Sequence, residues 1–368
     1  MPKSGVSRKT RHHYLSIDRK FACNIIPPSG IKYPAEIIRA PVAPEKPMTE
    51  ATTLTSRISA NSAGMPLIDF LCGRFRYHTR PEWEIIIREG NIRVNGAAVR
   101  SDRILAKNDT VSYTVVLREP PVDGDIRIVH EEETFLAAAK PGNLPSHADG
   151  NFIKNTFIYM MRARMSDLGH RGPVKLVHRL DRETSGLILV ALEDEAHRAL
   201  VRQFERGSVE KEYLAVALGS IREKEFEVGG AIAPDPDSVI SIRNKVVPEG
   251  TPGSRPARTR FTVIETLHDA ALVRCVPATG RTNQIRIHLA HAGHPIAGDK
   301  LYGKSDDEFL EFVRNARGGN FAPLPWMEAP RHMLHASRLA FDHPVTGLRV
   351  SFECPAPEDM RDFIESRR

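Results

Sequence analysis

The sequence predicts an α+β protein in which a large domain, built on a mostly antiparallel sheet, follows a smaller domain. Beyond Asp125 the expected strands follow one another with few helices between them, which favours an antiparallel sheet over a doubly wound one. Pro120-Pro121 and the Asp123-Gly124 turn separate this region from a compact unit before it. With 368 residues, the chain is long enough for two such domains.

The composition is that of a globular protein with a moderate excess of basic residues. Hydrophobic residues make up 41% and charged residues 27%, and 52 Lys+Arg against 46 Asp+Glu give a formal net charge of +6. This excess suggests an anionic partner. No stretch approaches the roughly 20 apolar residues of a membrane span, so no membrane association is expected. The four cysteines form no Cys-x-x-Cys pair, which argues against a disulfide scaffold or a cysteine zinc site.

Residues 1–63 are expected to form a basic, proline-rich and flexible arm. The six prolines from Pro27 to Pro47 exclude a helix or a central strand there. No apolar segment follows the basic start, which excludes a secretory signal. We therefore expect a cytoplasmic protein, with an organelle transit peptide as the alternative that the Arg and Ser content keeps open.

Residues 64–118 are expected to form a small domain. Leu67, Phe70 and Leu71 indicate a short helix, and Pro81 suits the first turn of a second helix that ends before Gly90. The remaining elements are a strand at 92–94, the Asn95-Gly96 hairpin turn and a strand at 110–117. Residues 119–125 then read as a linker.

Residues 126–368 are expected to form the large domain, whose elements follow from apolar runs and helical spacing. The continuous apolar run at 186–192 suits a strand buried on both faces. The other strands are expected at 126–130, 135–139, 174–178, 212–218, 260–266, 270–276, 334–341 and 348–353. Helices are expected at 194–204, at 282–292 and after Pro357.

The segment from His178 to Gly186 (HRLDRETSG) places five potentially charged side chains in a connection between two apolar strands. An exposed turn is the simplest interpretation, but the apolar residues that run into the segment favour a connection anchored to the core. Arg179 and Arg182 favour the ionised form of Asp181 between them. An ionised, oriented carboxylate is what attack at a sugar carbon requires, and the two arginines suit a polyphosphate chain.

These residues, followed by the run 187–190, resemble the catalytic motif of the RluA-like family of RNA pseudouridine synthases. Three further stretches resemble that family in the same order: 211–215 its tyrosine-bearing strand, 279–299 its arginine-bearing helix and the residues after it, and 334–344 its closing strands. The resemblance covers roughly residues 126–363. Four motifs in the right order make a strong signal.

The resemblance implies the site residues and their roles. Asp181 acts on the ribose of a flipped-out uridine, Tyr213 lies against the base and Arg286 pairs with Asp181. Residues implied to bind substrate at this site are His178, Arg179, Arg182, Asn283 and Leu289. The family usually has histidine at position 283, and asparagine keeps the hydrogen bonding but not the titration. The isomerisation requires no cofactor and no metal.

The small domain resembles the alpha-L RNA-binding fold that often accompanies these enzymes, through the stretches 67–71, 86–90 and 92–96. Its arginines, Arg74 and Arg88 among them, would contact phosphates. The expected partner is therefore ribosomal or transfer RNA, with no obligatory protein partner evident.

Two other classes of function remain as alternatives. A catalytically silent RNA-binding or assembly factor could use the same fold, and only Asn283 favours it. A glycosidase acting on nucleosides would need a second carboxylate as acid, for which Glu183 is the nearby candidate. A metal site at His288, His291 and His294 is disfavoured, because this spacing drifts around a helix and no carboxylate completes the set.

Overall fold

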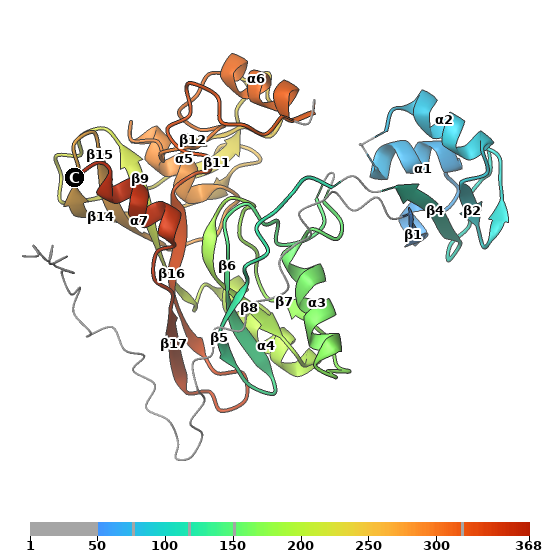
Figure 1. The fold of residues 1–368 in the computed structure, drawn as a ribbon, viewed down its shortest axis with the longest axis horizontal. Coiled ribbons are helices and arrows are strands. Elements are labelled where there is room, and N and C mark those ends of the chain that lie inside the picture. The colour runs from blue at the N-terminus through green and yellow to red at the C-terminus, as the bar shows by residue number, and fades with distance from the viewer. Residues whose placement is uncertain (1–50, 76–77, 117–118, 150–151, 318–319) are drawn as a thin grey trace, which may run out of the picture. The chain divides into compact units, whose positions relative to one another are not determined.

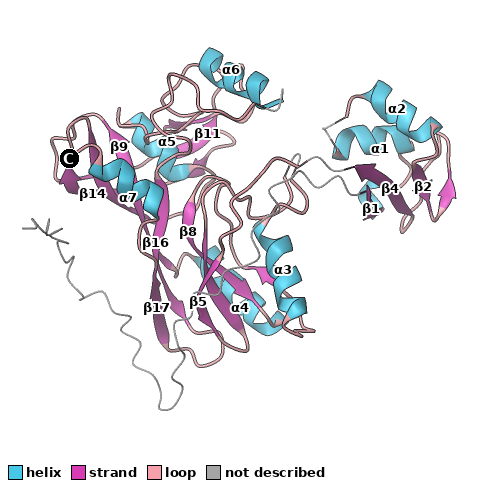
Figure 2. Cartoon of the chain, viewed as in Figure 1, coloured by secondary structure: helices cyan, strands magenta, loops and turns pink. Residues whose placement is uncertain are grey.

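The computed structural model describes residues 51–368, with gaps at 76–77, 117–118, 150–151 and 318–319 (Figure 1). Two parts of the chain are described separately below: the N-terminal unit, residues 51–116, and the large unit, residues 119–368. Figure 2 shows helices and strands in both, in keeping with the predicted α+β class.

The N-terminal unit has a four-stranded sheet and two helices. Its elements are β1 (Ala51–Arg57), a 3-10 turn (Ala60–Ser62), α1 (Leu67–Arg74), α2 (Arg80–Arg88), β2 (Ile92–Val94), β3 (Ala97–Ala98) and β4 (Thr110–Val116). The sheet order is β1-β4-β2-β3, and all its pairings are antiparallel. Both helices cover one core, in which Leu67, Leu71 and Trp83 are fully buried.

The boundary expected at residue 63 is wrong for β1. This strand lies in the range assigned to a flexible arm, yet it pairs with β4 over its whole length, from Ala51 opposite Val116 to Arg57 opposite Thr110. Thr53 and Thr55, both exposed, suit an edge strand with one solvated face, and Leu54 packs against the core of the N-terminal unit. Residues 1–50 of the expected arm lie outside the described residues.

The large unit is built on a ten-stranded sheet. Its strands are β5 (Arg127–Glu131), β6 (Phe135–Lys140), β7 (Lys175–Leu176), β8 (Ser185–Ala191), β9 (Glu210–Leu218), β10 (Glu225–Val228), β14 (Thr259–Thr266), β15 (Ala270–Pro277), β16 (Leu334–Asp342) and β17 (Arg349–Glu353). The order is β10-β14-β15-β9-β16-β8-β6-β5, with β17 on β16 and β7 on β8. Among the described strands, β8 and β16 form the one parallel pair, so the sheet is mostly antiparallel as predicted.

The helices of the large unit are α3 (Phe157–Asp167), α4 (Asp194–Arg206), α5 (Gln284–His291), α6 (Asp306–Arg317) and α7 (Glu358–Glu365). Strand β8 is buried on both faces because α3 and α4 cover opposite sides of it: Ile188 packs in the cluster with α3, and Leu189 in the cluster with α4. This explains the continuous apolar run. Neither α3 nor α6 was expected from the sequence.

A second, three-stranded sheet lies within the large unit and was also not expected. Its strands are β11 (Ala231–Pro234), β12 (Asn244–Val247) and β13 (Arg255–Pro256), in the order β12-β11-β13. Ile232 from this sheet packs with Ile287 of α5 and Leu301. The insertion therefore supports α5 from the side opposite the main sheet's core, which Ile285 and Leu289 enter.

The expected linker is wrong at its first residue. Glu119 is buried, and its carboxylate accepts hydrogen bonds from the backbone N–H groups of Ile153, Lys154 and Asn155, at 2.7 to 3.1 Å. Pro120 accepts a further bond from the Asn155 side chain. Residue 119 therefore belongs to the large unit. Within the described residues, no helix is both long and apolar enough to cross a membrane.

Candidate active site

Asp181 lies on the loop between β7 and β8, and its side chain is 27% exposed. The loop turns tightly, because the Thr184 N–H donates to the carbonyl of Asp181 at 3.1 Å. It then enters β8 through Gly186, which has φ +111° and lies so close to β16 that an added Cβ would sit 2.2 Å from the Ala336 carbonyl oxygen. Only glycine fits there, so the residue fixes where the loop leaves the sheet.

The backbone on both sides of Asp181 is held by the segment that follows β6. The Ser146 hydroxyl donates to the Leu180 carbonyl at 2.6 Å and accepts from the Leu180 N–H at 3.0 Å. Lys140, also buried, donates to the Arg182 carbonyl at 3.0 Å and to the Leu144 carbonyl at 2.8 Å. Burial, reinforced by Arg331, lowers the pKa of the Lys140 ammonium to about 7. The sequence analysis did not identify either residue; a lysine ending an apolar strand was the available signal.

Arg286, on α5, contacts Asp181 less closely than the pairing implied by the resemblance. Its Nη1 lies 3.3 Å from Asp181 Oδ2. The planar fork is engaged elsewhere: Nε donates to Asp299 Oδ2 at 2.6 Å and Nη2 to Asp299 Oδ1 at 2.8 Å. Burial opposes the charge, but Asp299 and then Asp181 raise the pKa of Arg286 above its ordinary value. Asp299 lies at the end of the segment 279–299 that resembles the family, but the sequence analysis gave it no role.

Asn283 immediately precedes α5 and has φ +57°, in the left-handed region. Asparagine and histidine are among the residues that tolerate this conformation best, which is a reason for either to occupy position 283. The Asn283 Oδ1 accepts from Arg286 Nη1 at 2.9 Å, and its Nδ2 donates to the Tyr302 hydroxyl at 3.3 Å. The left-handed residue also explains why α5 begins at Gln284 instead of Thr282, as the sequence predicted.

Tyr213 lies on β9 and is partly buried between two hydrophobic clusters, one on each half of the main sheet. Burial, with a further contribution from the charge of Asp181, raises the pKa of its phenol well above the ordinary value. The side chain is therefore a neutral phenol at physiological pH, and it is partly exposed and close enough to Asp181 for the charge of the carboxylate to act on it. This environment suits stacking on a base.

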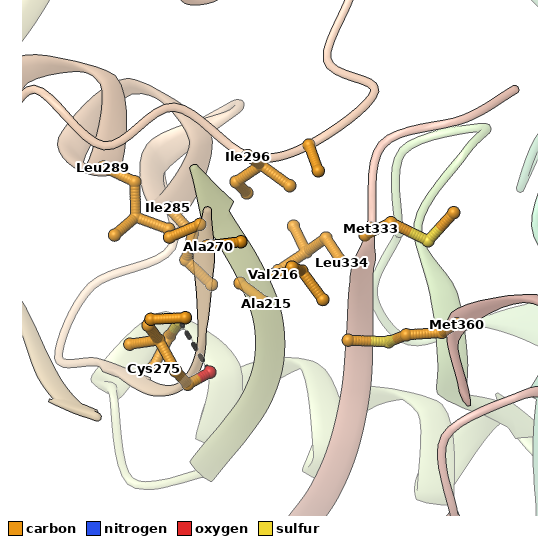
Figure 3. Close-up of a cluster of buried hydrophobic side chains, with 14 of the residues drawn as sticks. Ala215, Val216, Ala270, Cys275, Ile285, Leu289, Ile296, Met333, Leu334 and Met360 are labelled. Carbon is orange, nitrogen blue, oxygen red and sulfur yellow. Dashed lines mark hydrogen bonds between the residues drawn. The ribbon is translucent and has the colours of Figure 1, made fainter. Parts of the chain in front are cut away.

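The other expected substrate-binding residues of the large unit fall into two groups. Arg179 is exposed, and the partly exposed Arg182 pairs with Glu183 at 3.0 Å. His178 instead stacks on Phe204 at 4.5 Å and accepts the Leu189 N–H, and burial lowers its pKa to about 3. Leu289 is fully buried in the core (Figure 3). These contacts give His178 and Leu289 structural roles, because both side chains are occupied by the core.

Glu183 does not have the properties of a general acid. It is buried, pairs with Lys300 at 2.7 Å and accepts the His332 N–H at 3.2 Å. Burial alone would raise its pKa, but Lys300 and Arg182 together bring the pKa below the ordinary value. A glycosidase acid needs a raised pKa, so the glycosidase interpretation loses its second carboxylate.

Two of the three histidines at 288–294 make hydrogen bonds within the fold, and the third, His291, is exposed. His288 is buried and shares a 2.9 Å hydrogen bond with Thr259, and His294 lies 3.2 Å from the Leu218 carbonyl. In the part of the chain that the structure describes, no three His, Cys, Asp or Glu side chains are grouped so that they could hold a metal ion.

The fold and the site define a class of protein: an enzyme with a partly exposed aspartate, a buried arginine that contacts it and a neutral tyrosine nearby. Comparisons with known proteins agree. The family described as "RNA pseudouridylate synthase" matches residues 134–291. The "Uncharacterized RNA pseudouridine synthase YlyB" of Bacillus subtilis (strain 168) is 33% identical over 81% of this chain and 93% of its own length. The "Ribosomal large subunit pseudouridine synthase C" of Escherichia coli (strain K12) is 32% identical over 84% of this chain and 95% of its own length.

Among solved structures, "Human RNA Pseudouridylate Synthase Domain Containing 1" is 28% identical, with a TM-score of 0.48, over 63% of this chain and 84% of that one. The chain belongs to the RluA-like family of RNA pseudouridine synthases. It is an RNA-modifying isomerase, and its macromolecular partner is RNA.

Proposed function

We propose that this enzyme converts specific uridines of ribosomal RNA to pseudouridine, with Asp181 as the catalytic residue. The observation that carries the assignment of the site is the single Arg286 Nη1 contact at 3.3 Å to a carboxylate that is still partly exposed. The carboxylate is thus oriented and also accessible to a substrate. Ribosomal RNA is favoured over transfer RNA because the Escherichia coli relative is named for the large ribosomal subunit, and the match covers 95% of that relative and 84% of this chain.

The proposed reaction moves a glycosidic bond from nitrogen to carbon. Asp181 either attacks the anomeric carbon of the ribose or takes a proton from the neighbouring carbon, and the bond to the base nitrogen breaks. The freed uracil turns and forms a bond from its C5 to the anomeric carbon. In the first case the bond between Asp181 and the anomeric carbon breaks as the new bond forms, and in the second Asp181 returns its proton to the neighbouring carbon. The C5 proton then leaves and the nitrogen gains one, so the atoms balance. Tyr213 holds the base by stacking, and the raised pKa of its phenol argues against a phenolate as the base for that last proton.

Asn283 is compatible with this activity. Its amide oxygen contributes a hydrogen bond to Arg286 that does not depend on titration. Asn283 can therefore help to position Arg286. It gives no support to the catalytically silent alternative, which rested on this residue. The cytoplasmic location expected from the sequence stays a prediction.

The test is to map pseudouridines in total RNA from cells with and without this protein. We expect one or a few positions in ribosomal RNA to lose pseudouridine in its absence and to regain it when the wild-type chain is restored, but not when Asp181→Asn is restored. If pseudouridine were lost only from transfer RNA, the substrate would be transfer RNA and not ribosomal RNA. An unchanged map would contradict the proposal.

The N-terminal unit is proposed to bind RNA through phosphate contacts. Arg74 at the end of α1 and Arg88 at the end of α2 are both exposed, whereas Arg80 pairs with Asp69. An exposed arginine near a helix end can reach a phosphate at little cost in lost intramolecular bonds. These two exposed arginines and the resemblance to an alpha-L module support this role.

A chain that starts at residue 119 should therefore fold and retain catalysis but bind RNA less tightly. Each lost phosphate contact should flatten the log–log salt dependence of binding by roughly 0.7 to 0.9. Binding measured at several salt concentrations checks this. A chain that starts at Asp125 is the matched comparison, and it should be less stable because it lacks Glu119 and leaves three backbone N–H groups without their carboxylate. Equal RNA affinity and salt slope for full-length and 119–368 chains would assign the N-terminal unit another role.

A further inference from the structure

Asp299 is the principal partner of the arginine at the active site. Its side chain is fully buried, and both of its oxygens accept hydrogen bonds from the Arg286 fork, at 2.6 and 2.8 Å. The Arg286 contact to Asp181 is a single one at 3.3 Å. Bidentate pairing between a guanidinium and a carboxylate is stronger and more directional than a single contact. Asp299 therefore determines where the guanidinium lies.

The backbone fixes Asp299 in turn. Its Oδ1 accepts the N–H groups of Leu301 and Tyr302, at 2.9 and 3.0 Å. The preceding Gly298 has φ +76° and approaches the segment before β16 so closely that a Cβ would lie 2.1 Å from the Arg331 carbonyl oxygen. Burial alone would raise the pKa of Asp299, but Arg286 brings it below the ordinary value, so the carboxylate is ionised.

The hydrogens of the guanidinium are divided accordingly. Nε and Nη2 each give one to Asp299, and Nη1 gives one to Asn283 at 2.9 Å and one toward Asp181. Asp181 therefore receives a single N–H and shares the positive charge with a second carboxylate. Two carboxylates, Asp181 and Asp299, therefore compete for the one guanidinium of Arg286. A carboxylate bound by the whole fork would instead have both oxygens occupied and its charge neutralised.

We propose that Asp299 is a positioning residue that keeps the Arg286 fork away from Asp181, so that one N–H orients the catalytic carboxylate without neutralising it. The proposal rests on the proposed role of Asp181. In this arrangement Asp299 never touches the substrate. It tunes the reactivity of Asp181 by competing for the same arginine.

The test uses two variants of the full-length enzyme that move the charge balance in opposite directions. Asp299→Asn removes the competing charge and turns the fork toward Asp181. We expect single-turnover pseudouridine formation to fall about tenfold or more. We also expect the acid limb of the pH–rate profile to move to lower pH by about one unit, because an ionised carboxylate facing a full positive charge is harder to protonate.

Asn283→Asp is the second variant and serves if Asp299→Asn folds poorly. Aspartate tolerates the left-handed backbone at this position. The added carboxylate draws Nη1 away from Asp181, and its negative charge repels the Asp181 carboxylate. Asp181 should then be protonated more easily, so the acid limb of the pH–rate profile should move to higher pH. The other groups acting on Asp181 are Lys140 at the end of β6, Tyr213 on β9 and the flanking Arg179 and Arg182; neither variant alters them.

Asp359→Asn is the matched control. Asp359, on helix α7, forms a bidentate pair of the same geometry with Arg331, at 2.6 and 2.9 Å, although its side chain is 49% exposed. Its loss should lower the free energy of unfolding without moving the acid limb. An acid limb that stays in place in both test variants, or that moves to higher pH in Asp299→Asn, would overturn the proposal.

A second readout separates this proposal from the proposed function. The titration of Asp181 is followed in the free enzyme by carboxyl ¹³C NMR with labelled aspartate, which requires no turnover. Titration shifts of the expected sign in an enzyme that makes no pseudouridine would overturn the proposed function alone. Unchanged titration in an active enzyme would overturn the role of Asp299 alone.

Discussion

Asp181→Asn should abolish pseudouridine formation, with a loss of several orders of magnitude, while the fold and RNA binding remain intact. The amide has nearly the same shape as the carboxylate and can still accept the Arg286 N–H, but it can act neither as nucleophile nor as base. Single-turnover assays on an RNA that contains the target uridine measure the loss, and binding assays measure RNA affinity.

The control for this variant is Asp167→Asn, which removes the same charge from the exposed end of α3. It should leave the rate of pseudouridine formation unchanged. Activity of Asp181→Asn within roughly a factor of ten of the wild-type rate would remove Asp181 from the mechanism.

Arg286→Ala should be nearly as damaging to catalysis and should also destabilise the enzyme. Removing the arginine leaves Asp299 buried without its partner, and breaking a buried ion pair in this way costs about 3–5 kcal/mol. Asp181 loses the one N–H that orients it. Activity assays at a temperature well below the midpoint of unfolding separate the catalytic loss from the loss of stability.

Arg286→Lys should recover stability better than activity. An ammonium can pair with Asp299, but a point charge cannot reach Asp299, Asn283 and Asp181 with fixed directions as the planar fork does. The matched comparison is Arg331→Lys, which replaces the fork paired with Asp359. Full activity in Arg286→Lys would mean that charge alone suffices at this position.

The family and the fold class could be predicted because the motifs of the catalytic segment are contiguous in the sequence. Strand β8 was recognisable from its apolar run, and the structure brings Arg286 to within hydrogen-bonding distance of Asp181, 105 residues away. The division of the Arg286 fork was not predictable, because a motif shows which residues are present but not which pairs form. Asp299 binds the Arg286 guanidinium because backbone N–H groups hold its carboxylate in place, and only the folded turn brings those groups to it.

Other differences between the predicted and the observed roles of residues arise from burial, which the identity of a single residue does not reveal. His178 and Leu289 belong to the quoted motifs, yet their side chains pack in the core, because a loop next to a catalytic residue must itself be anchored. Glu119 looked like part of a linker because it adjoins two prolines. Its role as a cap for three N–H groups depends on residues more than thirty positions later.

The parallel pairing of β8 with β16 has a consequence for how the chain folds during translation. Ser185 and Gly186, which anchor the catalytic loop, are paired with His335 and Ala336, 150 residues further on. The strand that pairs with the start of β8 is therefore synthesised about 150 residues after it. The sheet cannot close until β16 has been translated, and such long-range pairing folds slowly. A nascent chain that ends before β16 leaves the edges of β8 and β9 unpaired at this position, so the catalytic loop lacks its anchor until β16 emerges.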